Sequence, residues 1–272
     1  MPDPALHHVV ITRFNIASPG REAAIRNRPG WLERRFDLFE AYCLPGMAAQ
    51  TVHDFEWLVY FDEATPDAFR SRIAAAQESV PFSAKFTGPL EMANTLRDII
   101  VPAIADRLVT TRLDNDDAVA VDLIERIQTA ARHCAPGTVL NFPNGLALRD
   151  RRLFAASDPS NPFTSLVEDA HAPLSGIWSV RHDALAERFQ VRQVDAPPVW
   201  LQVVHGDNVS NRIKGARVPA QAVAGRFVLK SEMLAEGGAA ALAVDRVLAA
   251  PLRTARERAI LLLKRARALL RR

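Results

Sequence analysis

Cysteine is scarce in this sequence: among 272 residues there are only Cys43 and Cys134. Two cysteines cannot form a disulfide framework, and neither has a second cysteine at zinc-binding spacing. Each lies in an apolar helical pattern, so we interpret both as buried free thiols. Isolated thiols are typical of a reducing compartment, and we expect a cytoplasmic protein.

Long hydrophobic runs are also missing. No stretch reaches the roughly 18 apolar residues that a membrane-spanning helix needs. Residues 1–15 contain no basic segment followed by an apolar one, which predicts that there is no signal peptide. The sequence has no internal repeat at solenoid spacing. Its hydrophobic content of 49% and charged content of 24% predict a globular protein.

Basic charge is sparse outside the C-terminal end, although the formal net charge is +3. Residues 251–272 hold eight lysines and arginines and one acid, whereas residues 1–250 hold 26 bases and 30 acids. A mildly acidic body disfavours nucleic acid as a partner. Glycine is sparse as well: residues 11–20 contain only Gly20. This disfavours a nucleotidyltransferase, which usually has a glycine-rich phosphate loop after its first strand.

The first half of the chain alternates strand and helix patterns, which is typical of a parallel sheet covered by helices. Strands are predicted at residues 7–14, 55–61, 83–87 and 109–113, and helices at 31–44, 66–78, 92–107 and 118–134. Functional sites in such sheets lie at the carboxyl ends of the strands. Polar segments follow three of the strands, at residues 13–15, 62–63 and 114–117.

The second half predicts shorter strands and a helical C-terminal end. Strands are expected at residues 138–141, 145–148, 152–156 and 199–204, and a helix at 182–190. The sequence Pro143-Asn144-Gly145 predicts a hairpin between the first two strands. We therefore expect an α/β domain over residues 1–224, with a small antiparallel portion, and a basic amphipathic helical extension over residues 225–272.

An acidic run, Asp114-Asn115-Asp116-Asp117, follows the strand at residues 109–113. Clustered carboxylates repel one another unless a positive partner is close. Mg²⁺ and Mn²⁺ take oxygen ligands, and Mg²⁺ is often shared with substrate phosphates, so the run predicts a site for Mn²⁺ or Mg²⁺ and a diphosphate. An EF-hand is excluded because its sixth position would be Val119 instead of glycine. A helix N-terminal cap remains an alternative for Asp116 or Asp117.

Six stretches of the chain resemble one family, the bacterial rhamnosyltransferases with a GT-A fold. They are HHVVITRFN, WLERRFDLFEAYCLPGMAAQ, FEWLVYFDEATP, TTRLDNDDA, LNFPNGLALRDRRLFAASDPSNPFTSLVE and WLQVVHGDNVSNR. Together they extend from His7 to about Arg212, and TTRLDNDDA is similar to the DxD region of such enzymes. The resemblance implies a GT-A-like mixed sheet flanked by helices. It also implies an inverting glycosyltransferase with a nucleotide-sugar donor. That donor is dTDP-rhamnose, with a UDP-hexose or a metal-dependent nucleotide-sugar hydrolase as alternatives.

The resemblance also implies roles for individual residues. Asp116 and Asp114 would bind the metal, and His205 would complete the metal site. A strand-end histidine bonded to the backbone is the alternative for His205. The residues expected at the donor are Thr12, Arg13, Asn15, Asp62, Arg97, Arg112, Asp114, Asn115 and Arg212. Arg212 and Lys214 would hold the diphosphate, unless they belong to a solvated basic loop, while Arg97 and Arg112 would meet the phosphates or the acidic run.

An inverting transferase needs a base for the acceptor hydroxyl. By its place in the chain, Glu168 is the first candidate and Asp169 the second, with a surface pair of acids as the alternative.

The C-terminal apolar residues from Leu252 to Leu270 repeat at helical spacing between arginines. A basic amphipathic helix predicts peripheral contact with an anionic membrane, where lipid-linked acceptors lie. A helix docked on the body or on another subunit is the alternative. The expected partners are thus a nucleotide-sugar donor and a glycan or lipid-linked acceptor.

Overall fold

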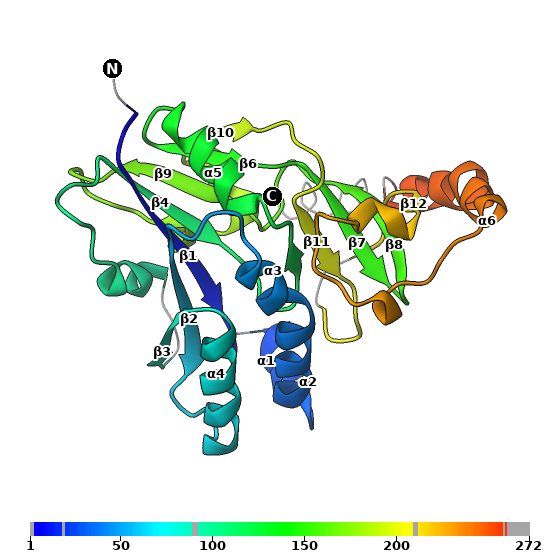
Figure 1. The fold of residues 1–272 in the computed structure, drawn as a ribbon, viewed down its shortest axis with the longest axis horizontal. Helices are drawn as coiled ribbons and strands as arrows, with labels where there is room; N and C mark the ends of the chain where they lie inside the picture. Colours follow the sequence, from blue (N-terminus) through cyan, green and yellow to red (C-terminus); the bar gives the residue numbers. More distant parts are fainter. Residues whose placement is uncertain (1–2, 18–19, 89–91, 209–211, 258, 260–272) are drawn as a thin grey trace, which may run out of the picture.

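The computed structural model describes residues 3–17, 20–88, 92–208, 212–257 and 259. Two β-sheets lie side by side, with helices packed around them (Figure 1). The larger sheet has the strand order β10-β6-β9-β4-β1-β2-β3, and the smaller one β12-β8-β7-β11-β5. The mixed α/β architecture expected from the sequence is confirmed.

The larger sheet consists of β1 (Leu6–Arg13), β2 (Glu56–Asp62), β3 (Ser83–Thr87), β4 (Arg107–Arg112), β6 (Thr138–Asn141), β9 (Ser165–Asp169) and β10 (Gln190–Gln193). Strands β1 to β4 run parallel to one another, whereas β9 runs antiparallel to both β4 and β6. The smaller sheet consists of β5 (Ala118–Val119), β7 (Asn144–Arg149), β8 (Arg152–Ser157), β11 (Trp200–Val203) and β12 (Arg217–Val218).

Helical segments cover both faces of the larger sheet. The α-helices are α1 (Arg21–Arg26), α2 (Trp31–Leu38), α3 (Leu44–Ala48), α4 (Asp67–Ser79), α5 (Leu123–Arg132) and α6 (Ala239–Val244). The 3-10 turns are η2 (Met92–Asp98), η3 (Ile177–Ser179), η4 (His182–Glu187), η5 (Ala220–Val223) and η6 (Ser231–Met233), and the π turns are η1 (Phe39–Cys43) and η7 (Asp245–Ala249).

Side chains of β1 alternate between the two faces of the sheet, because successive residues of a strand point to opposite sides. Val10 packs in the core beneath the helices α2 to α5, together with Phe36 and Ile127. Val9 packs in a second core on the other face, where η3 contributes Ile177. Burial on both faces explains why the strand reads as a continuous apolar run.

The helix predicted at residues 31–44 continues further than expected. It passes from α2 through the π turn η1 into α3, although Pro45 had predicted its end. Pro45 lies in the first turn of α3, directly after the π turn, and the chain stays helical although the proline nitrogen has no hydrogen to donate. Gly46 follows, and a Cβ there would lie 2.8 Å from the carbonyl oxygen of Val119. The small residue therefore lets α3 pack directly on β5.

Three other helix predictions were too long. Of residues 92–107, only η2 is helical, and Pro102 lies in the irregular segment that leads into β4. Residues 118–119 form strand β5 before α5 begins at Leu123. Residues 182–187 form the 3-10 turn η4 instead of a regular helix. In each case the apolar spacing did not fix the backbone conformation. Within residues 92–107 it did not predict burial either, because Ile100 and Ile104 are exposed.

The hairpin predicted around Pro143-Asn144-Gly145 was wrong. Strand β6 belongs to the larger sheet and β7 to the smaller one, so the segment carries the chain from one sheet to the other. The actual hairpin joins β7 to β8. Its turn residues, Asp150 and Arg151, have positive φ angles of 49° and 63°. Such angles are uncommon for residues other than glycine, so the turn had no strong signal in the sequence.

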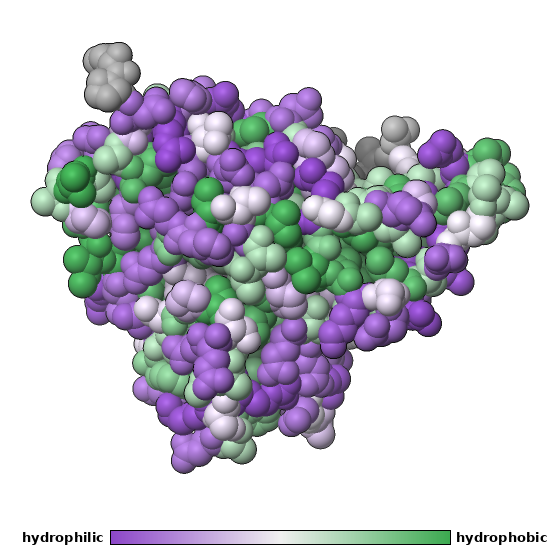
Figure 2. All heavy atoms as spheres, in the orientation of Figure 1, coloured by the Kyte–Doolittle hydropathy of each residue, from purple (hydrophilic) through white to green (hydrophobic). Residues whose placement is uncertain are grey.

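The helix formed by residues 239–257 lies beside β12 at the end of the smaller sheet (Figure 1). Arg253 connects it to the sheet by donating hydrogen bonds to the carbonyl oxygen of Gly215. Its outer face exposes Val244, Val247, Leu248 and Leu252, and apolar surface is visible at this end of the molecule in Figure 2. No helix among the described residues is long and apolar enough to cross a membrane.

Candidate active site

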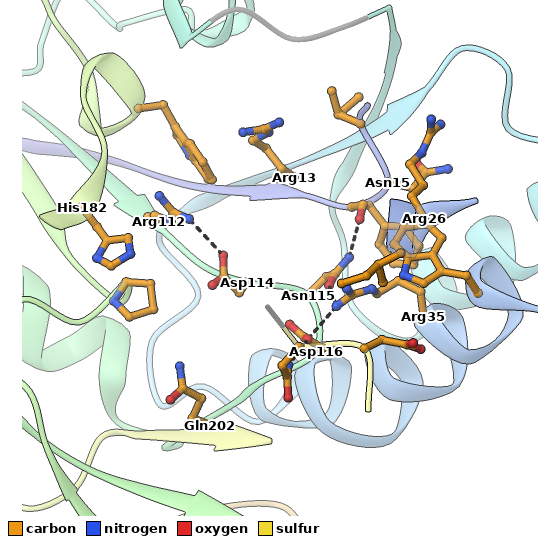
Figure 3. Close-up of a pocket in the computed structure, with 18 of the residues that line it drawn as sticks. Arg13, Asn15, Arg26, Arg35, Arg112, Asp114, Asn115, Asp116, His182 and Gln202 are labelled. Atoms are coloured by element: carbon orange, nitrogen blue, oxygen red, sulfur yellow. Dashed lines mark hydrogen bonds and ion pairs between the residues drawn. The ribbon is translucent and has the colours of Figure 1, made fainter. Parts of the chain in front are cut away.

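A cavity of about 560 Å³ opens where β1 and β4 end, between helix α2 and the segments that follow β8 and β11. The acidic run joins β4 of the larger sheet to β5 of the smaller one, so it lies where the two sheets meet. Figure 3 shows its side chains together with those of β1 and α2. The charged residues lining the cavity are Arg13, Arg26, Arg35, Arg112, Asp114, Asp116, Asp158, Asp183, Asp207, Arg212 and Lys214.

Three residues of the acidic run line this cavity, namely Asp114, Asn115 and Asp116. Asp114 is the most exposed of them, with Arg112 Nη2 3.6 Å from its Oδ1. Asn115 fixes the loop, because its Nδ2 donates to the carbonyl oxygen of Phe14 at 2.7 Å. The loop is thereby tied to the residue that follows β1.

Asp116 Oδ2 is surrounded by three nitrogen atoms. Arg35 Nη1 lies 2.6 Å away, His205 Nε2 2.9 Å and Asn208 Nδ2 3.4 Å. Burial alone would raise the pKa of Asp116. The charge of Arg35 and the hydrogen bond from His205 outweigh that effect, so the pKa lies below its usual range. Asp116 is therefore an ionised carboxylate held inside the protein.

Asp117 does not line the cavity. It is buried, and its Oδ1 accepts a hydrogen bond from the backbone N–H of Val203 at 2.7 Å. Burial, followed by the charges of Asp116 and Asp114, raises the pKa of Asp117 well above its usual range. This side chain connects the acidic run to the end of β11 and so positions the segment that carries His205.

The carboxylates of Asp114 and Asp116 suit a hard divalent cation, which needs only one or two protein carboxylates when substrate phosphates complete its coordination. The fit of His205 is poorer. Its Nδ1 accepts from the N–H of Asp207 at 3.2 Å, which leaves the proton of the neutral ring on Nε2, the atom that faces Asp116. Among the described residues, no group of three or more His, Cys, Asp or Glu side chains could hold a metal.

Two arginines flank an aromatic ring at the opposite side of the cavity. The guanidinium carbons of Arg13 and Arg112 lie 5.2 Å and 4.1 Å from the ring centre of Trp178. Nε1 of Trp178 is buried without a hydrogen-bond partner, as is Nε1 of Trp31 across the cavity. Buried unpaired donors are costly in a folded protein, so both indoles are suited to an anionic or hydroxyl-bearing ligand.

The remaining predicted donor residues divide into two groups. Arg13, Asn15, Arg112 and Arg212 line the cavity. Thr12, Asp62 and Arg97 do not. Thr12 accepts a hydrogen bond from Trp57 inside the core. Asp62 forms an ion pair with Arg26 and accepts a hydrogen bond from the N–H of Ala64. Arg97 is exposed on η2.

Glu168 and Asp169 lie away from the cavity. In the register between β4 and β9, Glu168 is opposite Leu108 and Asp169 is opposite Arg107, at the start of β4, whereas the cavity lies at its end. Glu168 accepts the N–H groups of Ser175 and Gly176, and Asp169 accepts that of His171. These contacts hold the loop that follows β9. Because β9 runs antiparallel to β4, the two acids lie at the edge of the sheet opposite the cavity.

Sequence reasoning missed Trp31, Arg35 and His182, all of which line the cavity. Trp31 and Arg35 were interpreted only as part of an amphipathic helix, although α2 presents both to the cavity. A pair of one aromatic and one basic residue four positions apart was the available signal. His182 was placed in a helix, and the sequence held no sign that η4 lies near the acidic run.

Comparison with known proteins identifies a family. Residues 7–217 match the family described as "Putative rhamnosyl transferase", and no curated protein matches significantly. Among solved structures, S. aureus TarS 1–349 in complex with UDP has a TM-score of 0.45 at 10% identity, over 74% of this chain and 60% of that chain. The inositol-1-phosphate CTP transferase from T. maritima has a TM-score of 0.37 at 10% identity, over 74% and 90%. By the family match, the chain belongs to the rhamnosyl transferases, a family of glycosyltransferases.

Proposed function

We propose that the protein transfers rhamnose from dTDP-rhamnose to a hydroxyl group of a glycan or lipid-linked acceptor. The observation that carries the proposal is the place of the acidic run: in a member of this family, Asp114 and Asp116 line one cavity with Arg13 and Arg112. Clustered carboxylates and arginines together suit a sugar-linked diphosphate better than either group alone.

The cavity offers two kinds of chemistry. Arg13, Arg112 and Trp178 supply positive charge and one indole N–H to the diphosphate. Asp114, which lies beside Arg112, and Asp116 would hold Mn²⁺ or Mg²⁺ against the same diphosphate. When bound, the metal acts as a Lewis acid on the phosphate leaving group. Asn115 keeps the acidic run at the end of β1, and Asp117 keeps it next to β11.

His182 is our candidate for the base that takes the proton of the acceptor hydroxyl. It lines the cavity, and its Nδ1 lies 2.8 Å from the carbonyl oxygen of Ser160. A carbonyl oxygen only accepts, so Nδ1 carries the proton of the neutral ring and Nε2 keeps its lone pair. Figure 3 shows His182 on the same side of the cavity as Arg112 and Asp114.

The carboxylates at the cavity support a direct displacement with inversion. Each of the five that line it in the described residues lies within 4.0 Å of a lysine or arginine nitrogen: Asp114, Asp116, Asp158, Asp183 and Asp207. Pairing with a cation occupies the oxygen lone pairs that a nucleophile or a base would use. This favours attack by the acceptor itself over a covalent sugar–enzyme intermediate.

We further propose that the C-terminal helix brings the enzyme to an anionic membrane surface. Val244, Val247, Leu248 and Leu252 form an exposed apolar face on residues 239–257. The sequence from Pro251 onward adds eight basic side chains against one acid. Apolar area combined with basic charge suits an anionic bilayer surface. The continuation of the apolar stripe from residue 260 to 272 lies outside the described residues.

Thermal-shift titrations test the proposed donor. We expect dTDP-rhamnose with Mn²⁺ to raise the melting temperature, since a ligand that binds only the folded state stabilises it. UDP-glucose is titrated in the same way, because it represents the alternative donor, a UDP-hexose. Asp116→Asn should lose the shift, whereas Asp67→Asn should keep it, because the Asp67 side chain is 97% exposed on α4 and remote from the cavity.

The release of dTDP separates transfer from hydrolysis. Release that requires an acceptor supports a transferase, and equal release with water alone supports the nucleotide-sugar hydrolase. If no nucleotide sugar shifts the melting temperature of the parent protein, the proposed function fails.

A further inference from the structure

Arg35 and Asp116 form a buried ion pair at the edge of the cavity. Their side chains are 15% and 10% exposed, and Nη1 of Arg35 lies 2.6 Å from Oδ2 of Asp116. The same nitrogen lies 3.2 Å from Oδ1 of Asn115. The guanidinium group also lies over the ring of Trp31, at 5.2 Å from its centre. Arg35 is thus held by three neighbours, two of them in the acidic run (Figure 3).

A divalent cation and this guanidinium group would compete for one carboxylate. Two positive groups on Asp116 would repel each other strongly in a buried site, where water screens charge poorly. Arg35 must therefore leave Asp116 before a metal ion can bind there. Removing a charge from a buried pair is costly unless it gains a new partner. Without such a partner, Arg35 stays paired with Asp116, and the carboxylate does not bind a metal ion.

A diphosphate is the partner that the cavity provides. A guanidinium group binds phosphate oxygens through two parallel hydrogen bonds. Next to Arg35, Nε1 of Trp31 is an unpaired donor on a side chain that is 8% exposed. Arg35 and Trp31 line the same cavity as the acidic run. A diphosphate at this end would gain both donors, and Asp116 would become available to the metal.

We propose that Arg35 is the resident counter-ion of Asp116 and makes metal binding depend on the nucleotide diphosphate. The proposal rests on the donor site proposed above. Because coupling between two ligands is reciprocal, the metal strengthens binding of the nucleotide by the same factor as the nucleotide strengthens binding of the metal. The site thereby favours the complete pair of donor and metal over either ligand alone.

Titration of the free Mn²⁺ signal by electron paramagnetic resonance tests this without any acceptor. In the absence of nucleotide, we expect Arg35→Gln to bind Mn²⁺ at least about tenfold more tightly than the parent protein, a typical size for coupling between sites. Arg35→Lys keeps the charge and should stay weak. Arg126→Gln is the matched control, because Arg126 pairs with a single aspartate, Asp122, away from the cavity.

Repeating the titrations with dTDP, and separately with UDP, measures the coupling. The nucleotide should tighten Mn²⁺ binding strongly in the parent protein and much less in Arg35→Gln. Adding Asp116→Asn to Arg35→Gln should remove the gain, which places the ion at Asp116. Thermal melts of each variant verify that it is folded.

Two results would overturn the proposal, and they differ in what they leave standing. Equal Mn²⁺ affinity in the parent and in Arg35→Gln, lost in Asp116→Asn, keeps the metal site but removes the role of Arg35. No Mn²⁺ binding to either protein, with or without nucleotide, removes both this proposal and the metal of the proposed function.

Discussion

His182 is the residue on which the proposed chemistry makes the sharpest prediction. If its Nε2 takes the proton of the acceptor, His182→Ala should lower kcat by about 10² to 10⁴, the usual contribution of a general base. The affinity for dTDP should stay unchanged, because the diphosphate is bound by other side chains. A normal kcat in His182→Ala would show that another group takes the proton.

His8 gives a prediction about stability and pH. The residue is buried in β1, and its Nε2 lies 2.7 Å from Thr111 Oγ1, which in turn lies 2.7 Å from Ser165 Oγ. Burial, reinforced by the nearby His7, lowers the pKa of His8 to about 3. The ring is therefore neutral in the folded protein, whereas in the unfolded chain it titrates near its ordinary value of 6.5.

The sign of the effect follows from proton binding. Between pH 6.5 and 3 the unfolded state binds the extra proton, so His8 makes the free energy of unfolding fall as pH falls. The slope approaches about 1.4 kcal/mol per pH unit, the value for one proton. Urea unfolding of the parent and of His8→Gln at several pH values measures the difference. Parallel curves for the two proteins would contradict the low pKa.

At the scale of single elements, the side chain of Arg107 caps the C-terminal end of helix α5. From the start of β4, its Nη1 donates to the carbonyl oxygens of Ala131 and Cys134, both at 2.6 Å. The last carbonyl groups of a helix have no partners within it, and a cation near them is also favoured by the helix dipole. One side chain thus fastens the helix to the sheet.

Arg107→Ala should lower the free energy of unfolding by about 2 kcal/mol, the scale of a hydrogen bond that involves a charged group. Arg107→Lys should lose less, because it keeps the charge. Chemical denaturation measures both. The loss should not depend on added nucleotide, since Arg107 does not line the cavity. A neutral effect of the alanine variant would mean that water replaces the arginine at no cost.

For the whole molecule, the proposed membrane surface can be tested with vesicles. We expect the protein to sediment with vesicles that contain phosphatidylglycerol and much less with phosphatidylcholine alone, and high salt should weaken the binding. Val247→Glu combined with Leu248→Glu should abolish it. Ile104→Glu is the matched control. Ile104 is also an exposed apolar residue (82%), but it belongs to the segment between η2 and β4 and not to this helix. Salt-independent self-association through the same face would instead identify a second copy of the chain as the partner.

Much of the fold was predictable from local patterns. The strands β1, β2, β3, β4, β6, β7, β8 and β11 were predicted within two residues of their ends, because buried strands carry a strong apolar signal. The site was predicted in part. Asp114, Asn115, Asp116, Arg13 and Arg112 follow or end strands, and the carboxyl ends of parallel strands meet at one edge.

The failures share a physical cause. Glu168 was assigned by its order in the chain, but the direction of β9 decided at which edge of the sheet it lies. Pro143-Asn144-Gly145 carried a turn signal, but the pairing of β7 with β8 made it a crossing between sheets. Strand direction and pairing depend on contacts between distant segments, which local sequence does not encode.

The sequence by itself determined that an acidic run follows a buried strand, and that this chain carries the motifs of one enzyme family. Only the tertiary structure decided which charges meet that run. Arg35 is 81 residues before Asp116 in the chain and His205 is 89 residues after it, yet both lie within 2.9 Å of the same oxygen atom. A carboxylate has no fixed chemistry of its own, because its protonation and its partners are set by the charges that folding brings next to it.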